Sequence, residues 1–217
     1  MSQGGYRDYL NKTFLEELNY KIWTTKGCRF NASTQLVKTG KLSDLAINMI
    51  SVYLTFAGLL TVYNINSNIL YDNILDDNLL VYLITSISIL ALIFGQIECA
   101  KDYTLKTKEF HNCRLELSEI YNKLRIFKTL EENPTPERKT QFTEQISNSY
   151  QKVLEKYDNH LPVDNKVFKT KTANYHKLNF LKIIRYSLEH YFHSCLLYYF
   201  LIISPAIIIA ILLIYRN

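Results

Sequence analysis

The sequence lacks the motifs of the common enzyme classes. It contains no GxGxxG, no P-loop, no HExxH and no GxSxG pattern. Its four cysteines form no CxxC pair, so their spacing supports neither a disulfide framework nor a zinc site. We therefore expect a protein that is not an enzyme and that binds no cofactor and no metal ion.

Glycine and strand patterns are scarce as well. Only six of the 217 residues are glycine, and no sustained alternation of polar and apolar residues occurs outside the most hydrophobic stretches. Apolar residues instead recur at helical spacing. We predict an all-α protein.

Charge is absent from three long stretches. Residues 45–63 and 79–97 are 19 residues long each, and residues 191–215 make up 25. A helix of the shorter length rises about 28 Å, close to the thickness of the hydrocarbon core of a bilayer. We therefore predict a membrane protein with three transmembrane helices, although the mean hydropathy of the whole chain, −0.07, is that of a soluble protein.

Lysine and arginine are distributed unevenly around these spans. Residues 1–44 contain seven and residues 98–190 contain 17, whereas residues 64–78 contain none and Arg216 alone follows the third span. Cations near membrane spans stay on the cytoplasmic side. We expect both basic regions to be cytoplasmic, with a short external loop at 64–78 and an external C-terminus. The net charge of +5 then reflects topology and anionic headgroups, and we expect no direct contact with nucleic acid.

The N-terminal region at 6–40 has the pattern of an amphipathic helix, with Gly27 and Gly40 as candidate breaks. Its apolar residues recur at steps of four: Leu10, Phe14, Leu18 and Ile22. Two interpretations remain open. The helix packs in a cytoplasmic bundle, or it lies in the membrane plane with Trp23 at the headgroups.

A second apolar stripe follows the second span. No glycine or proline lies between Gln96 and Asn133, so we expect that span to continue unbroken into the cytoplasm as one helix of about 50 residues. Apolar residues in it follow alternating steps of three and four, which is typical of a coiled coil or a bundle seam. We predict a homo-oligomer whose seam contains Phe110, Cys113, Leu117, Ile120, Leu124 and Phe127.

Two proline-containing stretches divide the cytoplasmic region at 98–190. In ENPTPERKTQ the long helix ends, Thr135 is a candidate cap and Pro136 suits the first position of the next helix. We expect these two helices to form an antiparallel hairpin. DNHLPVDN interrupts the chain again around Pro162, where Asp164 is a candidate cap, and the pattern from Lys177 leads without a break into the third span.

Small and polar residues recur along one face of each of the first two spans. They are compatible with close helix packing and with the wall of a polar pore built from several copies. In a resting assembly we expect their hydroxyls to be satisfied by neighbouring helices. No charged residue lies at a membrane midplane, which disfavours a proton relay or a coupled transporter. The pore-lining candidates are Asn48, Ser51, Thr55, Thr85, Ser88 and Gln96.

Three segments carry a family resemblance. RFNASTQL precedes the first span, KEFHNCRLELSEIYNKLRIF follows the second, and YQKVLEKYDNHLPVDNKVF lies further on. In this order, around two closely spaced spans, they resemble the SLATT family of bacterial membrane effectors over nearly the full chain.

The resemblance implies a function. Members are encoded beside nucleotide second-messenger synthases or reverse transcriptases in anti-phage systems. By this resemblance the protein oligomerises in the bacterial inner membrane, perforates or depolarises it when triggered, and arrests growth of the infected cell. Its companion would be a nucleotidyltransferase or a reverse transcriptase. The alternative is a membrane anchor or scaffold that recruits a cytosolic defence enzyme without forming a pore.

The predicted topology is testable with two single cysteines in a background without the native ones. A cysteine at position 67 (Ser67→Cys) should react with a membrane-impermeant thiol reagent in intact cells, because the loop at 64–78 is expected outside. A cysteine at position 118 (Ser118→Cys) should react only after the cells are opened. Labelling at position 118 in intact cells would contradict the orientation.

Overall fold

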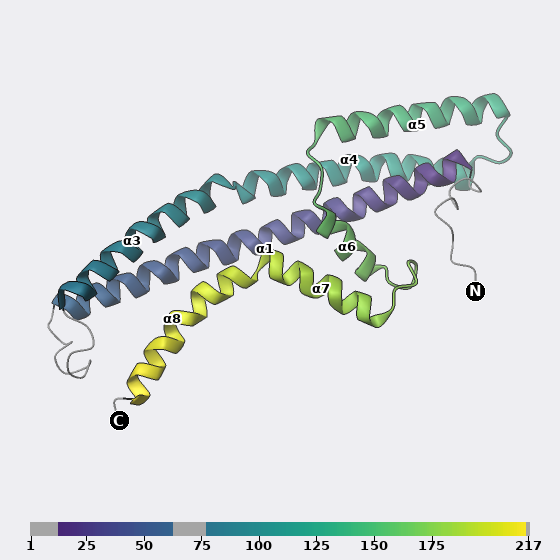
Figure 1. Ribbon diagram of the computed structural model, residues 1–217. Helices are drawn as coiled ribbons and strands as arrows, with labels where there is room; N and C mark the ends of the chain where they lie inside the picture. The colour runs from purple at the N-terminus through teal and green to yellow at the C-terminus, as the bar shows by residue number, and fades with distance from the viewer. Residues whose placement is uncertain (1–12, 63–76, 216–217) are drawn as a thin grey trace. The chain divides into compact units, whose positions relative to one another are not determined.

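The computed structural model describes residues 13–62 and 77–215, and nearly all of them are helical (Figure 1). The helices are α1 (Phe14–Val62), α3 (Asp77–Ala100), α4 (Tyr103–Leu130), α5 (Pro136–Lys156), α6 (Pro162–Lys171), α7 (Phe180–Ser194) and α8 (Leu196–Tyr215). No strand occurs in these ranges, so the prediction of an all-α fold is confirmed. Most of the predicted external loop at 64–78, and Arg216, lie outside the described residues.

The chain divides into two compact units. The first unit contains Met1–Leu36 and Thr104–His190, and the second unit contains Val37–Tyr103 and Tyr191–Asn217. The second unit therefore holds all three uncharged stretches, and the first holds most of the charged sequence.

The core of the first unit is formed by the beginning of α1 together with α4 and α5. Its buried members are Leu18, Ile22, Cys113, Leu117, Ile120, Leu124, Ile146 and Val153. Because Leu18 and Ile22 are buried here, the structure supports the bundle interpretation of the N-terminal helix and not the in-plane one.

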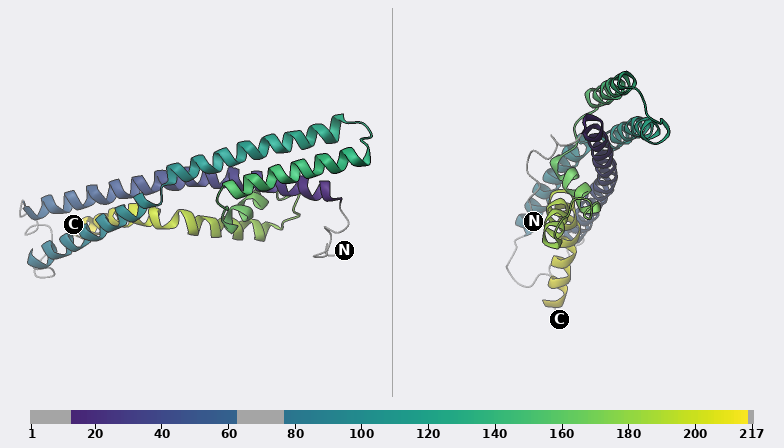
Figure 2. Two further views of the ribbon diagram at one scale, coloured as in Figure 1. Left: turned by 90° about the horizontal axis from the view of Figure 1, so that it is seen from above. Right: turned by 90° about the vertical axis from the view of Figure 1, so that its right-hand side faces the viewer.

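Helices α4 and α5 form the predicted antiparallel hairpin, and they lie side by side in Figures 1 and 2. Near the turn, the Phe127 and Phe142 rings stack with their centroids 3.9 Å apart. At the other end, the Tyr157 hydroxyl donates a hydrogen bond of 2.7 Å to Glu116 Oε1. Residues early in α4 thus face residues late in α5, as an antiparallel pair requires.

The stripe predicted as a seam between copies lies inside this core. Five of its six residues are buried within a single chain: Cys113, Leu117, Ile120, Leu124 and Phe127. The sixth, Phe110, is half-buried. Helices α1 and α5 of the same chain supply the contacts that we expected from a second copy. The periodicity is therefore explained by intrachain packing, and it carries no argument for a contact between copies.

Helix α1 is longer than predicted, with 49 residues and no break at either glycine. Both glycines instead allow another segment to approach closely. A Cβ at Gly27 would lie 2.1 Å from Cε2 of Phe168 in the first unit, and a Cβ at Gly40 would lie 3.1 Å from the Cβ of Tyr103 in the second. The prediction of breaks at Gly27 and Gly40 is wrong because tertiary packing outweighs the low helix propensity of glycine.

The helix expected to run unbroken from the second span is interrupted. Helix α3 ends at Ala100 and α4 begins at Tyr103, and between them Asp102 has a φ of 43°. Aspartate adopts this left-handed conformation more readily than most residues, so the break needs no glycine or proline. The prediction missed this break at 101–102, whereas the two helices still follow one another as a single helical segment of 50 residues, Val81–Leu130.

The predictions at the first proline-containing stretch are confirmed. Pro136 is the first residue of α5, and Thr135 Oγ1 accepts a hydrogen bond of 3.3 Å from the backbone N–H of Arg138. At the second stretch, α6 begins at Pro162, so Asp164 is its third residue and not its cap as predicted. Asp164 Oδ2 still stabilises the start of α6, because it accepts a hydrogen bond of 2.9 Å from the backbone N–H of Leu161.

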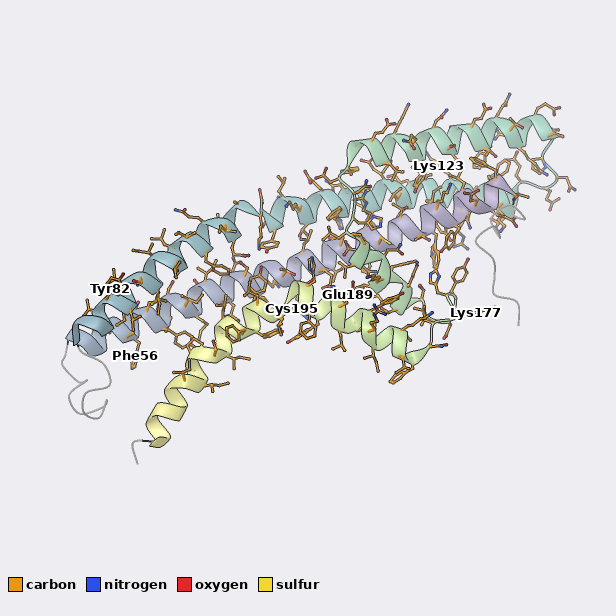
Figure 3. All side chains as sticks on the ribbon, viewed as in Figure 1. Phe56, Tyr82, Lys123, Lys177, Glu189 and Cys195 are labelled. Atoms are coloured by element: carbon orange, nitrogen blue, oxygen red, sulfur yellow. The ribbon has the colours of Figure 1, made fainter. Side chains whose placement is uncertain are left out.

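The approach to the third uncharged stretch is not continuous, contrary to our expectation. Helix α7 ends at Ser194, and the chain bends by 65° before α8. Cys195, labelled in Figure 3, lies at this bend. The predicted span at 191–215 therefore begins inside α7 and includes the bend.

Two helical segments of the described chain are long and apolar enough to cross a membrane, Phe14–Leu59 and Val81–Leu130. A third span results when α7 and the described part of α8 are counted together as one bent span. The structure is thus that of an all-helical membrane protein with two or three spans.

The close approach at Gly27 can be tested by substitution. Gly27→Ala should destabilise the protein by about 1–3 kcal/mol, because the added methyl group overlaps the Phe168 ring. The measurement is the thermal unfolding midpoint in detergent. Gly58→Ala is the matched control, since a Cβ there meets no atom within 4 Å and alanine favours helix. Equal midpoints for the two variants would contradict the proposed packing role.

Candidate functional site

A buried carboxylate lies at the end of α3 in the second unit. Glu98 is 3% exposed, and its Oε2 accepts hydrogen bonds from the hydroxyls of Ser43 at 2.9 Å and Tyr198 at 2.8 Å. The Tyr103 hydroxyl donates to the same oxygen at 3.0 Å. Oε1 accepts from Lys101 Nζ at 2.5 Å. The Glu98 carboxylate therefore connects α1, α3, the start of α4 and α8.

The break after α3 builds this site. The left-handed conformation of Asp102 turns the chain so that Lys101 and Tyr103, on either side of it, both reach back to Glu98. Gly40 in α1 presents no side chain to Tyr103, which permits the close approach of the two segments. The same interruption that ended the predicted long helix thus supplies two of the four donors.

Burial makes this cluster energetically important. An unpaired buried carboxylate costs several kcal/mol or takes up a proton, whereas here each oxygen has at least one donor. The Tyr103 and Tyr198 hydroxyls are also 2.8 Å apart, which extends the network. Further along the spans, the Tyr53 hydroxyl donates to the carbonyl oxygen of Ile202 at 2.9 Å. Helix α8 is therefore hydrogen-bonded to the other helices of the second unit at two positions along its length, Tyr198 and Ile202.

A groove between α1 and α3 lies beside this cluster in the second unit. Its lining consists of Ile47, Ile50, Ser51, Leu54, Ser88, Ala91, Leu92, Gly95, Gln96 and Cys99. Three of the pore-lining candidates, Ser51, Ser88 and Gln96, are thus brought together. The other three, Asn48, Thr55 and Thr85, are exposed but do not line the groove.

The hydroxyls in the spans are satisfied by their own helices and not, as we expected, by neighbouring ones. Ser51 Oγ donates to the Ile47 carbonyl oxygen at 3.0 Å, and Ser88 Oγ donates to that of Ile84 at 2.8 Å. Thr55 and Thr85 also donate to the carbonyl four residues earlier. The serine hydroxyls of the groove therefore have no unmet donor, and with Ala91 and Gly95 they provide small side chains against which another membrane helix can pack closely.

The first unit contains a second, aromatic groove. It is lined by Tyr20 and Trp23 of α1, Tyr121 of α4 and Tyr175, together with Glu16 and Asn19. The Trp23 and Tyr175 rings pack edge to face with centroids 5.1 Å apart, and Tyr175 remains 61% exposed. A tryptophan surrounded by tyrosines, one of which is exposed, is typical of protein-binding surfaces.

A buried cation lies deeper in the same unit. Arg29 is fully buried, and its guanidinium lies 5.1 Å from the centroid of the Phe110 ring. None of its side-chain nitrogens has a hydrogen-bond partner. Burial, with a smaller contribution from this guanidinium, lowers the pKa of His160. The described residues contain no group of three or more His, Cys, Asp or Glu side chains placed to hold a metal ion.

The Glu98 cluster was not identified from the sequence. Glu98 is the first charged residue after the second uncharged stretch, and Lys101 is three residues away, which is the only local signal of a pair. Nothing in the sequence connects it with Ser43 or Tyr198, because these partners are 55 and 100 residues away along the chain.

Removing one donor tests the role of the cluster. Tyr198→Phe should lower the stability of the protein by about 1.5 kcal/mol, because a hydrogen bond to a buried carboxylate is lost. The thermal unfolding midpoint in detergent is the measurement. The neighbouring substitution Tyr199→Phe is the control, since the Tyr199 ring stacks on Tyr191 and its side chain does not contact Glu98. A midpoint unchanged by Tyr198→Phe would show that this hydrogen bond does not stabilise the second unit.

Comparison with known proteins identifies the family. Neither the curated proteins nor the solved structures gave a match. The profile of one family, described as SMODS and SLOG-associating 2TM effector domain family 5 (SLATT_5), matches residues 11–212. The match covers both units and confirms the resemblance noted in the sequence. The chain therefore belongs to the SLATT family, as a member of its family 5.

Proposed function

We propose that this protein is a membrane effector of a bacterial antiviral defence system, which oligomerises and perforates the inner membrane when triggered. The family is described as an effector domain with two transmembrane segments, and the chain has two or three helices that can span a membrane. The proposed outcome is depolarisation and growth arrest of the infected cell.

The observation that carries this proposal is the groove between α1 and α3. Three spans of one chain cannot enclose an aqueous channel, so a pore requires several copies. The groove has small residues on α3 at Ser88, Ala91 and Gly95, which let a helix of a second copy approach closely. We propose that it forms the contact between copies.

We propose that the polar residues of α1 next to this groove, Asn48 and Thr55, form the pore wall. Asn48 and Thr55 are seven residues apart on α1 and therefore lie on one helical face, next to Ser51. Asn48 is exposed, and the structure gives its amide no hydrogen-bond partner among the described residues. An amide in this position is stabilised by water or by a neighbouring copy, and both are present in a hydrated assembly.

The orientation follows the distribution of cations. We propose that the first unit lies in the cytoplasm and that the C-terminus lies outside, because the long charged region is rich in lysine and arginine. A trigger delivered by a companion protein, a nucleotidyltransferase or a reverse transcriptase, then reaches the first unit directly.

A specific observation also favours the second candidate function, a scaffold that recruits a defence enzyme. The aromatic groove at Trp23 and Tyr175 is suited to a protein partner. A scaffold of this kind binds its companion through the first unit and causes no leakage.

Filling the membrane groove tests the pore proposal. The double substitution Ser51→Leu and Ser88→Leu places two large side chains where a second copy would pack, and it should reduce both the oligomer mass in detergent and dye release from liposomes. Ser86→Leu is the matched control, because Ser86 makes the same kind of hydrogen bond, to the Tyr82 carbonyl at 2.9 Å, but does not line the groove.

The outcomes separate the two functions. Loss of oligomer and dye release in the groove variant, with both retained in Ser86→Leu, supports the pore. Undiminished dye release in the groove variant would overturn the groove as the contact between copies. A triggered wild-type protein that never releases dye, but loses its companion with Tyr175→Ala, would leave the scaffold as the function.

A further inference from the structure

Helix α7 carries an apolar face that nothing in the described structure covers. None of its 15 residues is buried. On this face Phe180 is 74% exposed, Leu181 78%, Leu188 51% and Phe192 59%. Phe180, Ile184 and Leu188 follow one another at steps of four, so they lie on the same side of the helix.

A different side of α7 holds it to the rest of the first unit. Glu189 forms an ion pair with Lys166 of α6, and Lys166 also lies 5.7 Å from the centroid of the Tyr186 ring. Ile183 and Tyr186 are half-buried on this side. Helix α7 is therefore packed on the first unit through residues outside the apolar face, and the apolar face stays exposed in the packed structure.

The connection to α8 indicates what covers the apolar face. The chain bends by 65° at Cys195 and continues into α8, the most apolar helix of the structure (Figures 1 and 3). A helix bent by this angle from a span that follows the membrane normal lies closer to the membrane plane than to the normal.

The positive charges on α7 also suit a membrane surface. Lys182 and Arg185 are exposed, and Arg185 directly follows Ile184 of the apolar face. Long cationic side chains place their stems along apolar surface and their charges at lipid phosphates. A helix with a wide apolar face bordered by such residues is typical of a membrane-surface helix.

We propose that α7 is an in-plane helix that binds the surface of a membrane containing anionic lipid, through Phe180, Leu181, Ile184, Leu188 and Phe192, with Lys182 and Arg185 at the headgroups. This assignment is independent of pore formation. It requires only that α8 is inserted, and it makes the bend at Cys195 the point where the chain passes from the membrane surface into the membrane.

Tryptophan fluorescence of the full-length protein in vesicles tests the proposal. The chain has a single tryptophan, so Trp23→Phe creates a background in which an introduced residue is the only probe. Leu188→Trp in this background should be quenched several-fold more strongly by brominated phosphatidylcholine than Lys182→Trp, because position 182 lies outside the apolar face, at the level of the headgroups and away from the brominated acyl chains. Phe192→Trp is a second probe on the apolar face, should Leu188→Trp fold poorly.

A second measurement tests whether binding depends on the charge of the lipid. Emission from position 188 should shift further to the blue when phosphatidylglycerol is added to phosphatidylcholine vesicles, and Lys182→Gln with Arg185→Gln should abolish this difference. Equal quenching at positions 188 and 182 would overturn the in-plane placement. A blue shift that depends on protein concentration without quenching by brominated lipid would also overturn it, in favour of a contact with a second copy. Neither measurement uses dye release, so these outcomes do not depend on whether the protein forms a pore.

Discussion

The burial of the Glu98 carboxylate is the constraint on which the second unit depends. A charged group placed at the end of an apolar helix must be supplied with hydrogen-bond donors, and a single helix cannot supply four. They come from α1, from the turn after α3, from α4 and from α8. In a bilayer, where the hydrophobic effect does not drive helices together, such a polar cluster and the fit of small residues are what remains to select one packing of the spans.

The two units solve the problem of helix packing by different means. The first unit buries a continuous apolar core between α1, α4 and α5, in the manner of a water-soluble bundle. The second unit buries few side chains and relies on hydrogen bonds between particular residues, such as that of Tyr53 with the backbone of α8. Both units use glycine for close packing, because Gly27 leaves room for the Phe168 ring in the first unit and Gly40 leaves room for Tyr103 in the second.

Local features of the fold could be predicted from the sequence, and features that depend on distant partners could not. The uncharged stretches are continuous in sequence, and the prolines at 136 and 162 each act within one turn of helix, so the first two membrane helices and the starts of α5 and α6 were predicted. The apolar stripe from Cys113 to Phe127 is buried, but we assigned it to a contact between copies, because periodicity does not tell whether the opposing helix belongs to the same chain. The break at Asp102 was missed because it is stabilised by Glu98 and Tyr103 in three dimensions and not by a glycine or a proline. Of the polar candidates in the spans, some line the groove and others do not. Which of them line it depends on how α1 and α3 are rotated relative to each other, and the sequence does not determine this rotation.

The division into units has a consequence for biosynthesis. Each unit is assembled from two stretches of sequence, and the first unit needs residues up to Leu36 together with residues from Thr104 onward. The ribosome therefore produces the first half of this core, then both early spans, and only afterwards the helices that complete it. Leu18 and Ile22 must wait for α4 and α5, so the core has a high contact order and closes late. Residues 45–97 are thus synthesised before the helices that complete the first unit.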